Sequence, residues 1–406
     1  MCFQRVRARF DRHVETPHGI EPTRLDAISE RLADVLADVT RCSTQLGQRL
    51  HQATARSLAE LLRITNSYYS NLIEGIVTRP RDIERALAEQ LDDDRRARDL
   101  QREAVAHVRV QREIDTRHAD GEHEEPAASE FVRWIHRAFY EDAPMSMLRV
   151  ECSDGSSYQM TPGVFRSEPL HDNVVGRHLP PSSRTVQSFM THFEGQFRME
   201  EMGPARRLVQ VAIAHHRFNY IHPFPDGNGR VSRLLSHAMA QRAGIGAHGL
   251  WSISRGLSRG LPGRPSYKSM MDAADAPRAG DLDGHGNLSL AALCDFTQWF
   301  CEVMLDQLSF MSSQLELDSL QERLATYVER DLGLSESAAA IARDALIRGE
   351  ISRGEAARIT GLRERAARDV LGRLTECGLL ASNSPKGPVS LRISAAAAET
   401  LFPRLF

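Results

Sequence analysis

The segment HPFPDGNGRVSR places several chemically useful side chains within twelve positions. His222 titrates near neutral pH and can therefore accept a proton from a hydroxyl group. Asp226 offers the oxygen ligands that Mg²⁺ prefers. Gly227 and Gly229 permit a tight loop whose N–H groups converge on an anion, and Arg230 adds a cationic fork. The segment therefore concentrates a histidine, an aspartate and an anion-binding loop with an arginine fork within twelve residues.

The elements around this segment must be helices. Residues 208–221 are strongly apolar and read as a helix, which the two following prolines bring to an end. Arg230 opens the next helix, so the positive end of that helix dipole points into the loop. His215 and His216 lie on the first helix, and we expect both in the core or at the helix end.

Composition narrows the chemistry further. The chain has 406 residues, enough for two or three domains, and a formal net charge of −3. Its only lysines are Lys268 and Lys386, and neither follows a glycine-rich loop, so Schiff-base and P-loop chemistry have almost no place. Arginine, backbone N–H groups or a metal must therefore hold any phosphate.

Targeting and metal-binding signals are scarce. The six cysteines form no C-x-x-C pair, no H-E-x-x-H is present, and no apolar run reaches the length of a membrane span. We therefore expect a soluble, cytoplasmic protein without membrane contact.

Residues 281–289 (DLDGHGNLS) resemble the start of an EF-hand loop, but His285 takes the fifth ligand position and Ala292 replaces the bidentate glutamate. A tight turn is therefore expected there.

Residues 222–233 match every position of H-x-F-x-[DE]-G-N-G-R-x-x-R, and in this they resemble the signature of the Fic (filamentation induced by cAMP) family. The resemblance extends over about 120–310. Residues 162–181 look like the family's flap hairpin, which clamps a target protein by strand addition. Residues 251–257 and Tyr267 resemble the segment beside the nucleotide.

The resemblance implies transfer of AMP from ATP to a hydroxyl side chain of a target protein docked on the flap, with release of pyrophosphate. His222 would be the general base and Asp226 the Mg²⁺ ligand. The implied nucleotide-binding residues are Gly227, Asn228, Gly229, Arg230, Arg233 and Tyr267. Doc-type kinases carry lysine where this chain has Gly229, which favours AMP transfer, although other nucleotides and phosphocholine stay open as donors.

A second motif suggests regulation. Ser70 to Gly75 (SNLIEG) matches the family's inhibitory pattern [ST]-x-x-x-E-[GN], on a helix predicted over 58–75. By resemblance, Glu74 would pair with Arg233 and occupy the place of the γ-phosphate. The alternative is a solvated glutamate before a helix-capping glycine. In some relatives the same glutamate supports removal of AMP, so de-AMPylation stays open too.

Residues 335–406 predict a winged helix-turn-helix, with three helices followed by two short strands around a wing at Lys386. Such a domain binds DNA in some proteins and contacts other proteins in others, and both alternatives stay open.

The sequence thus predicts a mainly α-helical chain with a Fic core and a β-hairpin flap. The expected parts are an N-terminal helical region (1–115), the core (116–310), a linking helix (311–334) and the winged helix (335–406). The leading function is an autoinhibited protein adenylyltransferase that uses ATP and Mg²⁺. The alternative is a nucleotide-sensing transcription regulator that binds DNA. A homodimer is one alternative for the oligomeric state.

Overall fold

The computed structural model describes residues 15–122, 124–152, 155–172 and 177–406. These residues form sixteen α-helices and four short strands, which confirms the predicted mainly α-helical class. They divide into two compact units. The first holds the described residues within 15–33, 122–243 and 262–301, and the second holds the rest. Each unit is described on its own.

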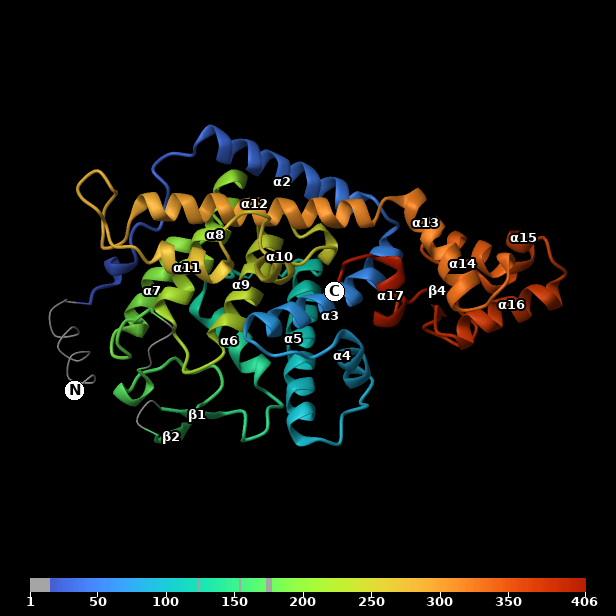
Figure 1. The fold of residues 1–406 in the computed structure, drawn as a ribbon, viewed down its shortest axis with the longest axis horizontal. Helices are drawn as coiled ribbons and strands as arrows, with labels where there is room; N and C mark the ends of the chain where they lie inside the picture. Colours follow the sequence, from blue (N-terminus) through green and yellow to red (C-terminus); the bar gives the residue numbers. More distant parts are fainter. Residues whose placement is uncertain (1–14, 123, 153–154, 173–176) are drawn as a thin grey trace. The chain divides into compact units, whose positions relative to one another are not determined.

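The first unit is built on helices α6 to α9 (Figure 1). Its elements are η1 (Pro17–Ile20), α6 (Ser129–Phe139), β1 (Arg149–Glu151), β2 (Ser157–Gln159), η2 (Pro169–His171), α7 (Val186–Phe197), α8 (Pro204–Ile221), α9 (Asn228–Arg242), α11 (Tyr267–Ala274) and the first half of α12 (Leu290–Gln314).

Helix α8 forms the centre of this unit because nearly all of its side chains after the first turn are buried. It packs against both α7 and α9. Phe193 and Phe197 of α7 and Phe218 of α8 form an aromatic cluster with ring centroids 4.5 to 6.0 Å apart. His215 and His216 are fully buried, which confirms their expected place in the core.

The strands of this unit precede the segment expected as the flap. β1 and β2 pair antiparallel, with Val150 opposite Tyr158. The described part of 162–181 contains η2 and irregular backbone, and residues 173–176 lie outside the described residues. Four prolines in 162–181 remove donors that a ladder would need, which explains why the named strands lie earlier in the chain.

The second unit is organised around α3 (Gln52–Ile73), which packs against α5 and α10. Its elements are α2 (Glu30–Gln48, beginning in the first unit), α3, α4 (Pro80–Leu87), α5 (Arg95–Ala119), η3 (Ala247–Gly249), α10 (Ile253–Arg259), the second half of α12, α13 (Leu317–Thr326), η4 (Tyr327–Asp331), α14 (Glu336–Arg348), η5 (Arg353–Glu355), α15 (Ala356–Thr360), α16 (Glu364–Glu376), β3 (Leu380–Ala381), β4 (Ser390–Leu391) and α17 (Ala395–Leu401).

Buried polar contacts fix α3 in this unit. The Asn66 side chain donates to Gln111 of α5 (2.7 Å) and accepts from Ser252 before α10 (2.7 Å). The Tyr69 hydroxyl donates to the Leu405 carbonyl near the chain end (3.1 Å). The helix predicted over 58–75 is present as α3, which starts earlier, at Gln52, and ends at Ile73.

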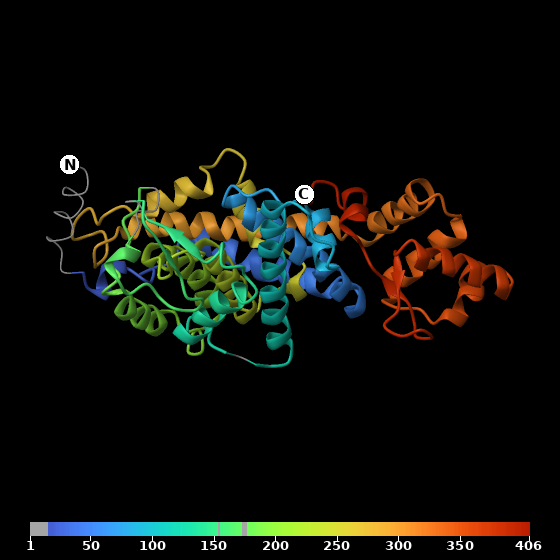
Figure 2. The same cartoon turned by 90° about the horizontal axis from the view of Figure 1, so that it is seen from below.

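The C-terminal elements α14 to α16 and the strand pair β3–β4 form one cluster (orange to red in Figure 2). Leu380 pairs with Leu391, and Ile351 forms an isolated bridge with Val389. The expected helices and strands are thus present in the expected order, while the winged-helix classification stays a prediction. No helix among the described residues is long and apolar enough to cross a bilayer.

Candidate active site

The loop between α8 and α9 carries the predicted chemistry. His222 caps α8 in a left-handed conformation (φ +50°), and its N–H donates to the Phe218 carbonyl (2.9 Å). Pro223 cannot donate a further helical hydrogen bond, so the chain leaves the helix immediately after the histidine. This bend places His222, which is half-buried, at the point where the loop begins.

Asn228 closes the loop with its side chain. Its Oδ1 accepts from the Phe224 N–H (2.8 Å), and its Nδ2 donates to the Phe224 carbonyl (2.7 Å). Both ends of the amide are therefore used to shape the loop. The nucleotide-binding role expected for Asn228 stays a prediction.

The start of α9 presents N–H groups to the loop. The first hydrogen bond at this end of the helix runs from the Val231 N–H to the Gly227 carbonyl (3.0 Å), so the N–H groups of Asn228, Gly229 and Arg230 precede it. Together with the helix dipole, they favour a phosphate oxygen at this position.

Gly227 cannot carry a side chain here. Its φ is +77°, and a Cβ would lie 2.7 Å from the Tyr140 hydroxyl of the residue that caps α6. The same hydroxyl accepts from Arg230 Nη2 (3.3 Å). Tyr140 thus fills the space beside Gly227 and contacts the Arg230 guanidinium.

Asp226 is the candidate metal ligand. Its side chain is half exposed, and its Oδ1 accepts from the Gly227 N–H (2.6 Å) and from Arg230 Nη2 (3.4 Å). An accessible carboxylate beside a helix N-terminus suits Mg²⁺, which is commonly held by one or two carboxylates and the phosphates of a substrate. The residues present therefore fit this ion.

Arg166 is a positioning residue that the sequence did not reveal. It is 3% exposed, and its guanidinium donates to the carbonyls of His222 (2.7 Å) and Ile221 (3.0 Å) and to that of Pro181. Asp172 balances its charge (2.8 Å). Burial lowers the pKa of Arg166 and Asp172 opposes that shift. The side chain thus ties the expected flap to the end of α8.

His136 of α6 is a second residue that the sequence did not reveal. The Gly163 N–H donates to its Nδ1 (2.8 Å), so Nε2 carries the proton and donates to the Asp226 carbonyl (3.2 Å). The ring stacks on Phe224 at a centroid distance of 3.9 Å. Burial lowers the pKa of His136 to about 3, so the imidazole stays neutral.

Arg233 and Tyr267 both interact with His215 of α8. Arg233 is 1% exposed. Burial of His215 and, as a smaller cause, the positive charge of Arg233 lower the pKa of His215 to about 3. The Ser236 hydroxyl donates to the Ser232 carbonyl, so its oxygen accepts from His215 Nδ1 (2.8 Å). Because Nδ1 carries the proton, Nε2 of the same ring accepts from the Tyr267 hydroxyl (2.8 Å). A neutral, buried histidine thus orients Tyr267.

The structure brings most predicted site residues into one unit. His222, Asp226, Gly227, Asn228, Gly229, Arg230, Arg233 and Tyr267 all belong to the first unit. Ser70, Glu74 and Gly75 belong to the second. There, Ser70 is buried, Glu74 ends α3, and Gly75 (φ +81°) donates to the Leu72 carbonyl (3.0 Å).

Comparisons with known proteins identify a family to which part of this chain is similar. The family model described as "Fic/DOC family" matches residues 126–240. The protein adenylyltransferases Fic of Culex quinquefasciatus and Aedes aegypti are 39% and 38% identical over 82 residues. Each match covers 20% of this chain and only 16% of the relative.

Solved structures show the same fold. A Fic family protein from Desulfovibrio desulfuricans aligns with a TM-score of 0.51 at 15% identity, over 90% of this chain and 97% of the other. Fic-1 from C. elegans aligns with a TM-score of 0.52 at 16% identity, over 70% of this chain and 73% of the other. Residues 126–240 of this chain thus match the Fic/DOC family model, and the chain shares the fold of solved Fic family proteins.

Proposed function

We propose that this chain is a protein adenylyltransferase that transfers AMP from ATP to the hydroxyl group of a serine, threonine or tyrosine in a target protein. The observation that carries the proposal is the loop after α8, which begins at His222 and ends at the N–H groups that start α9 at Asn228. A base beside an anion site is what this transfer requires.

The residues divide the reaction between them. His222 accepts the proton of the attacking hydroxyl as its oxygen bonds to the α-phosphorus. The bond between the α-phosphorus and the oxygen that bridges to the β-phosphate breaks, and pyrophosphate leaves with the electron pair. The N–H groups of Asn228 to Arg230 and the Arg230 guanidinium hold the phosphate oxygens. Asp226 would hold Mg²⁺, which neutralises charge on the leaving group when bound.

We further propose that Glu74 restrains this activity. The support is the Ser70-to-Gly75 pattern and its place at the end of α3, where Gly75 adopts the left-handed conformation of a helix cap. In this proposal Glu74 pairs with Arg233 in the position of the γ-phosphate and misaligns bound ATP. The same glutamate would serve de-AMPylation if it orients a water on the modified hydroxyl.

The test incubates each variant with α-labelled ATP and Mg²⁺. It measures the label transferred to proteins of a lysate and to the chain itself. Glu74→Gly should label far more strongly than wild type, and Glu74→Gly/His222→Ala should not label. Glu376→Gly, at the end of α16, is the matched control and should resemble wild type. Equal labelling by wild type and Glu74→Gly contradicts the restraint, and labelling by the double variant contradicts the role of His222.

A second candidate function is DNA binding by the C-terminal elements. The arginines at 363, 365, 368 and 373 are all exposed on or beside α16, and Lys386 is exposed between β3 and β4. Phosphate contacts by such residues weaken steeply with salt. Full-length protein should retard random duplex DNA at low salt and Arg365→Ala/Arg373→Ala should do so less, whereas no retardation at low salt contradicts this candidate.

A further inference from the structure

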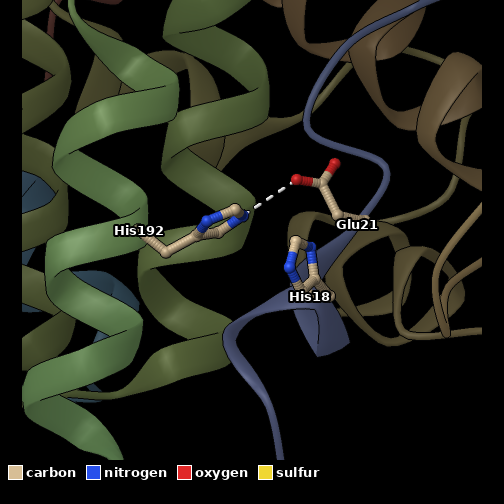
Figure 3. A group of neighbouring side chains, drawn as sticks. All are labelled: His18, Glu21 and His192. Carbon is tan, nitrogen blue, oxygen red and sulfur yellow. Dashed lines mark hydrogen bonds and ion pairs between the residues drawn. The ribbon is translucent and has the colours of Figure 1, made fainter.

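Three potential metal ligands meet outside the proposed active site, in the first unit. His18 lies in η1, Glu21 caps that turn, and His192 projects from the middle of α7 (Figure 3). One ligand atom from each lies within 4.8 Å of the other two. From this arrangement we infer that His18, Glu21 and His192 form a binding site for Zn²⁺.

The donor set suits this ion. Two imidazoles and one carboxylate are common zinc ligands, and they are less typical of Mg²⁺ or Ca²⁺, which take mostly oxygen. Glu21 Oε1 lies 2.9 Å from His192 Nε2, and the His18 and His192 rings meet edge to face at 5.2 Å. The two rings and the carboxylate therefore converge on one point from two elements far apart in sequence (Figure 3).

Thr23 orients the carboxylate for this role. Its N–H (2.7 Å) and its hydroxyl (2.9 Å) both donate to Glu21 Oε2. Oε1 is consequently the oxygen that faces His192. A hydrogen-bonded second oxygen is the usual arrangement around a carboxylate that binds metal through one atom.

Burial adds to the case. Glu21 is 6% exposed, so its carboxylate is largely removed from water. A buried anion is stabilised further by a cation.

The backbone around Glu21 is held without a metal. Arg217 of α8 donates through Nε (3.2 Å) and Nη2 (3.0 Å) to the Pro22 carbonyl, and the Leu288 N–H donates to the Glu21 carbonyl (3.1 Å). A Cβ at Gly286 would lie 2.5 Å from the Glu21 Cβ, so the loop 281–289 packs closely on this residue. The site is thus preorganised by three segments.

His285 in that loop is the candidate fourth ligand. Its Nε2 lies 3.7 Å from Glu21 Oε2, and its side chain is 70% exposed. An exposed imidazole can rotate toward the ion at small cost. Residues 281–289, which resemble the start of a calcium-binding loop, would then contribute the His285 imidazole nitrogen to a zinc site.

The test measures metal binding and is independent of AMP transfer. Full-length protein, stripped with a chelator and desalted, is titrated with Zn²⁺ against a competing chelator, and with Co²⁺ to record its visible absorption. One tightly bound equivalent is expected in wild type and in Asp226→Asn. His18→Ala, Glu21→Gln and His192→Ala should each weaken Zn²⁺ binding by more than about 100-fold, and Thr23→Val by about 10- to 100-fold.

The controls separate loss of ligand from loss of fold. His18 is exposed, so His18→Ala should keep the circular dichroism spectrum of wild type measured in chelator. His118→Ala, at the end of α5, removes a histidine elsewhere and should leave Zn²⁺ affinity unchanged. His285→Ala should weaken binding less than loss of His18 or His192. Absence of tight Zn²⁺ binding in wild type, or equal binding in folded His18→Ala and wild type, overturns the inference.

Discussion

At the scale of single residues, two buried side chains fix the backbone on which the proposed chemistry depends. Arg166 donates to the carbonyls that end α8, and His136 bridges the Gly163 N–H and the Asp226 carbonyl. Loss of either side chain should slow the proposed reaction even without a contact to the nucleotide. The backbone that carries His222 and Asp226 would shift, and a displaced catalytic group reacts more slowly.

Replacing Arg166 should slow AMP transfer. In Arg166→Lys a single ammonium cannot reach the three carbonyls and Asp172 that the guanidinium fork contacts. In a Glu74→Gly background we expect kcat to fall by about 100-fold with a smaller change in KM for ATP. Initial rates below the unfolding temperature measure this, with Arg177→Lys as the exposed control from the same segment. An unchanged kcat would show that the hydrogen bonds of Arg166 do not position His222.

The buried histidines should make stability depend on pH. Burial lowers the pKa of both His136 and His215 to about 3 in the folded state, against an ordinary value of 6.5. The unfolded chain therefore binds more protons below pH 6.5. The free energy of unfolding is highest above that pH and falls as the pH drops toward 3, by up to about 1.4 kcal/mol per unit for each ring.

Denaturant unfolding between pH 7 and pH 5 tests this dependence before most carboxylates titrate. His136→Gln should reduce the slope, and His118→Ala should leave it as in wild type. A slope that His136→Gln does not alter would mean that the His136 imidazole is protonated in the folded protein.

At the scale of elements, the short connection between α8 and α9 depends on one glycine. Gly227 adopts φ +77° with Tyr140 directly against its α-carbon. The left-handed bend at His222 and the Asn228 amide complete the connection. A loop so tightly determined can present N–H groups in a fixed direction, which is what an anion site needs.

Gly227→Ala should therefore be more disruptive than its size suggests. The new methyl group would strain the backbone and meet the Tyr140 ring, at a cost of about 1 to 3 kcal/mol, and AMP transfer should be lost. Denaturant unfolding and transfer assays measure the two effects. Gly195→Ala in α7, where a Cβ meets nothing within 4 Å, is the control. It should keep wild-type activity and at least wild-type stability, because alanine favours a helix more than glycine does. Normal transfer by Gly227→Ala would contradict the assigned role of the loop.

At the scale of the whole molecule, the end of the chain stabilises α3 in the second unit. Leu405 is 1% exposed, and its carbonyl accepts from the Tyr69 hydroxyl (3.1 Å) and from Arg255 Nε (3.2 Å). Arg255 Nη2 also donates to the Arg404 carbonyl (2.7 Å). The helix that ends at Glu74 is therefore packed against residues more than 300 positions later.

Leu405→Ala should destabilise the second unit by about 2 to 5 kcal/mol, since it leaves a cavity beside α3. Amide hydrogen exchange in α3 should rise accordingly. Arg404→Ala keeps the carbonyl that Arg255 contacts and should change stability little. Equal exchange in α3 for Leu405→Ala and wild type would show that the chain end does not support this helix.

Much of the candidate site could be predicted from local sequence. The two prolines after His222 and the glycines at 227 and 229 restrict backbone conformation within a few residues, so the helix–loop–helix and its anion site follow from the segment itself. The same holds for Gly75, whose left-handed cap ends α3 near the predicted position.

Other features depend on contacts between distant segments, and no local pattern marks them. Arg166 and His136 appear in the sequence as an ordinary arginine and histidine, and only packing brings them to the loop, 56 and 90 positions away. His18, Glu21 and His192 likewise become neighbours through the fold.

The sequence by itself determined the loop between α8 and α9, because backbone restrictions at proline and glycine act over neighbouring residues. Tertiary structure decided which buried side chains hold that loop and which histidines meet a carboxylate. Burial and long-range hydrogen bonding set these contacts, and neither is encoded in the spacing of residues along one segment.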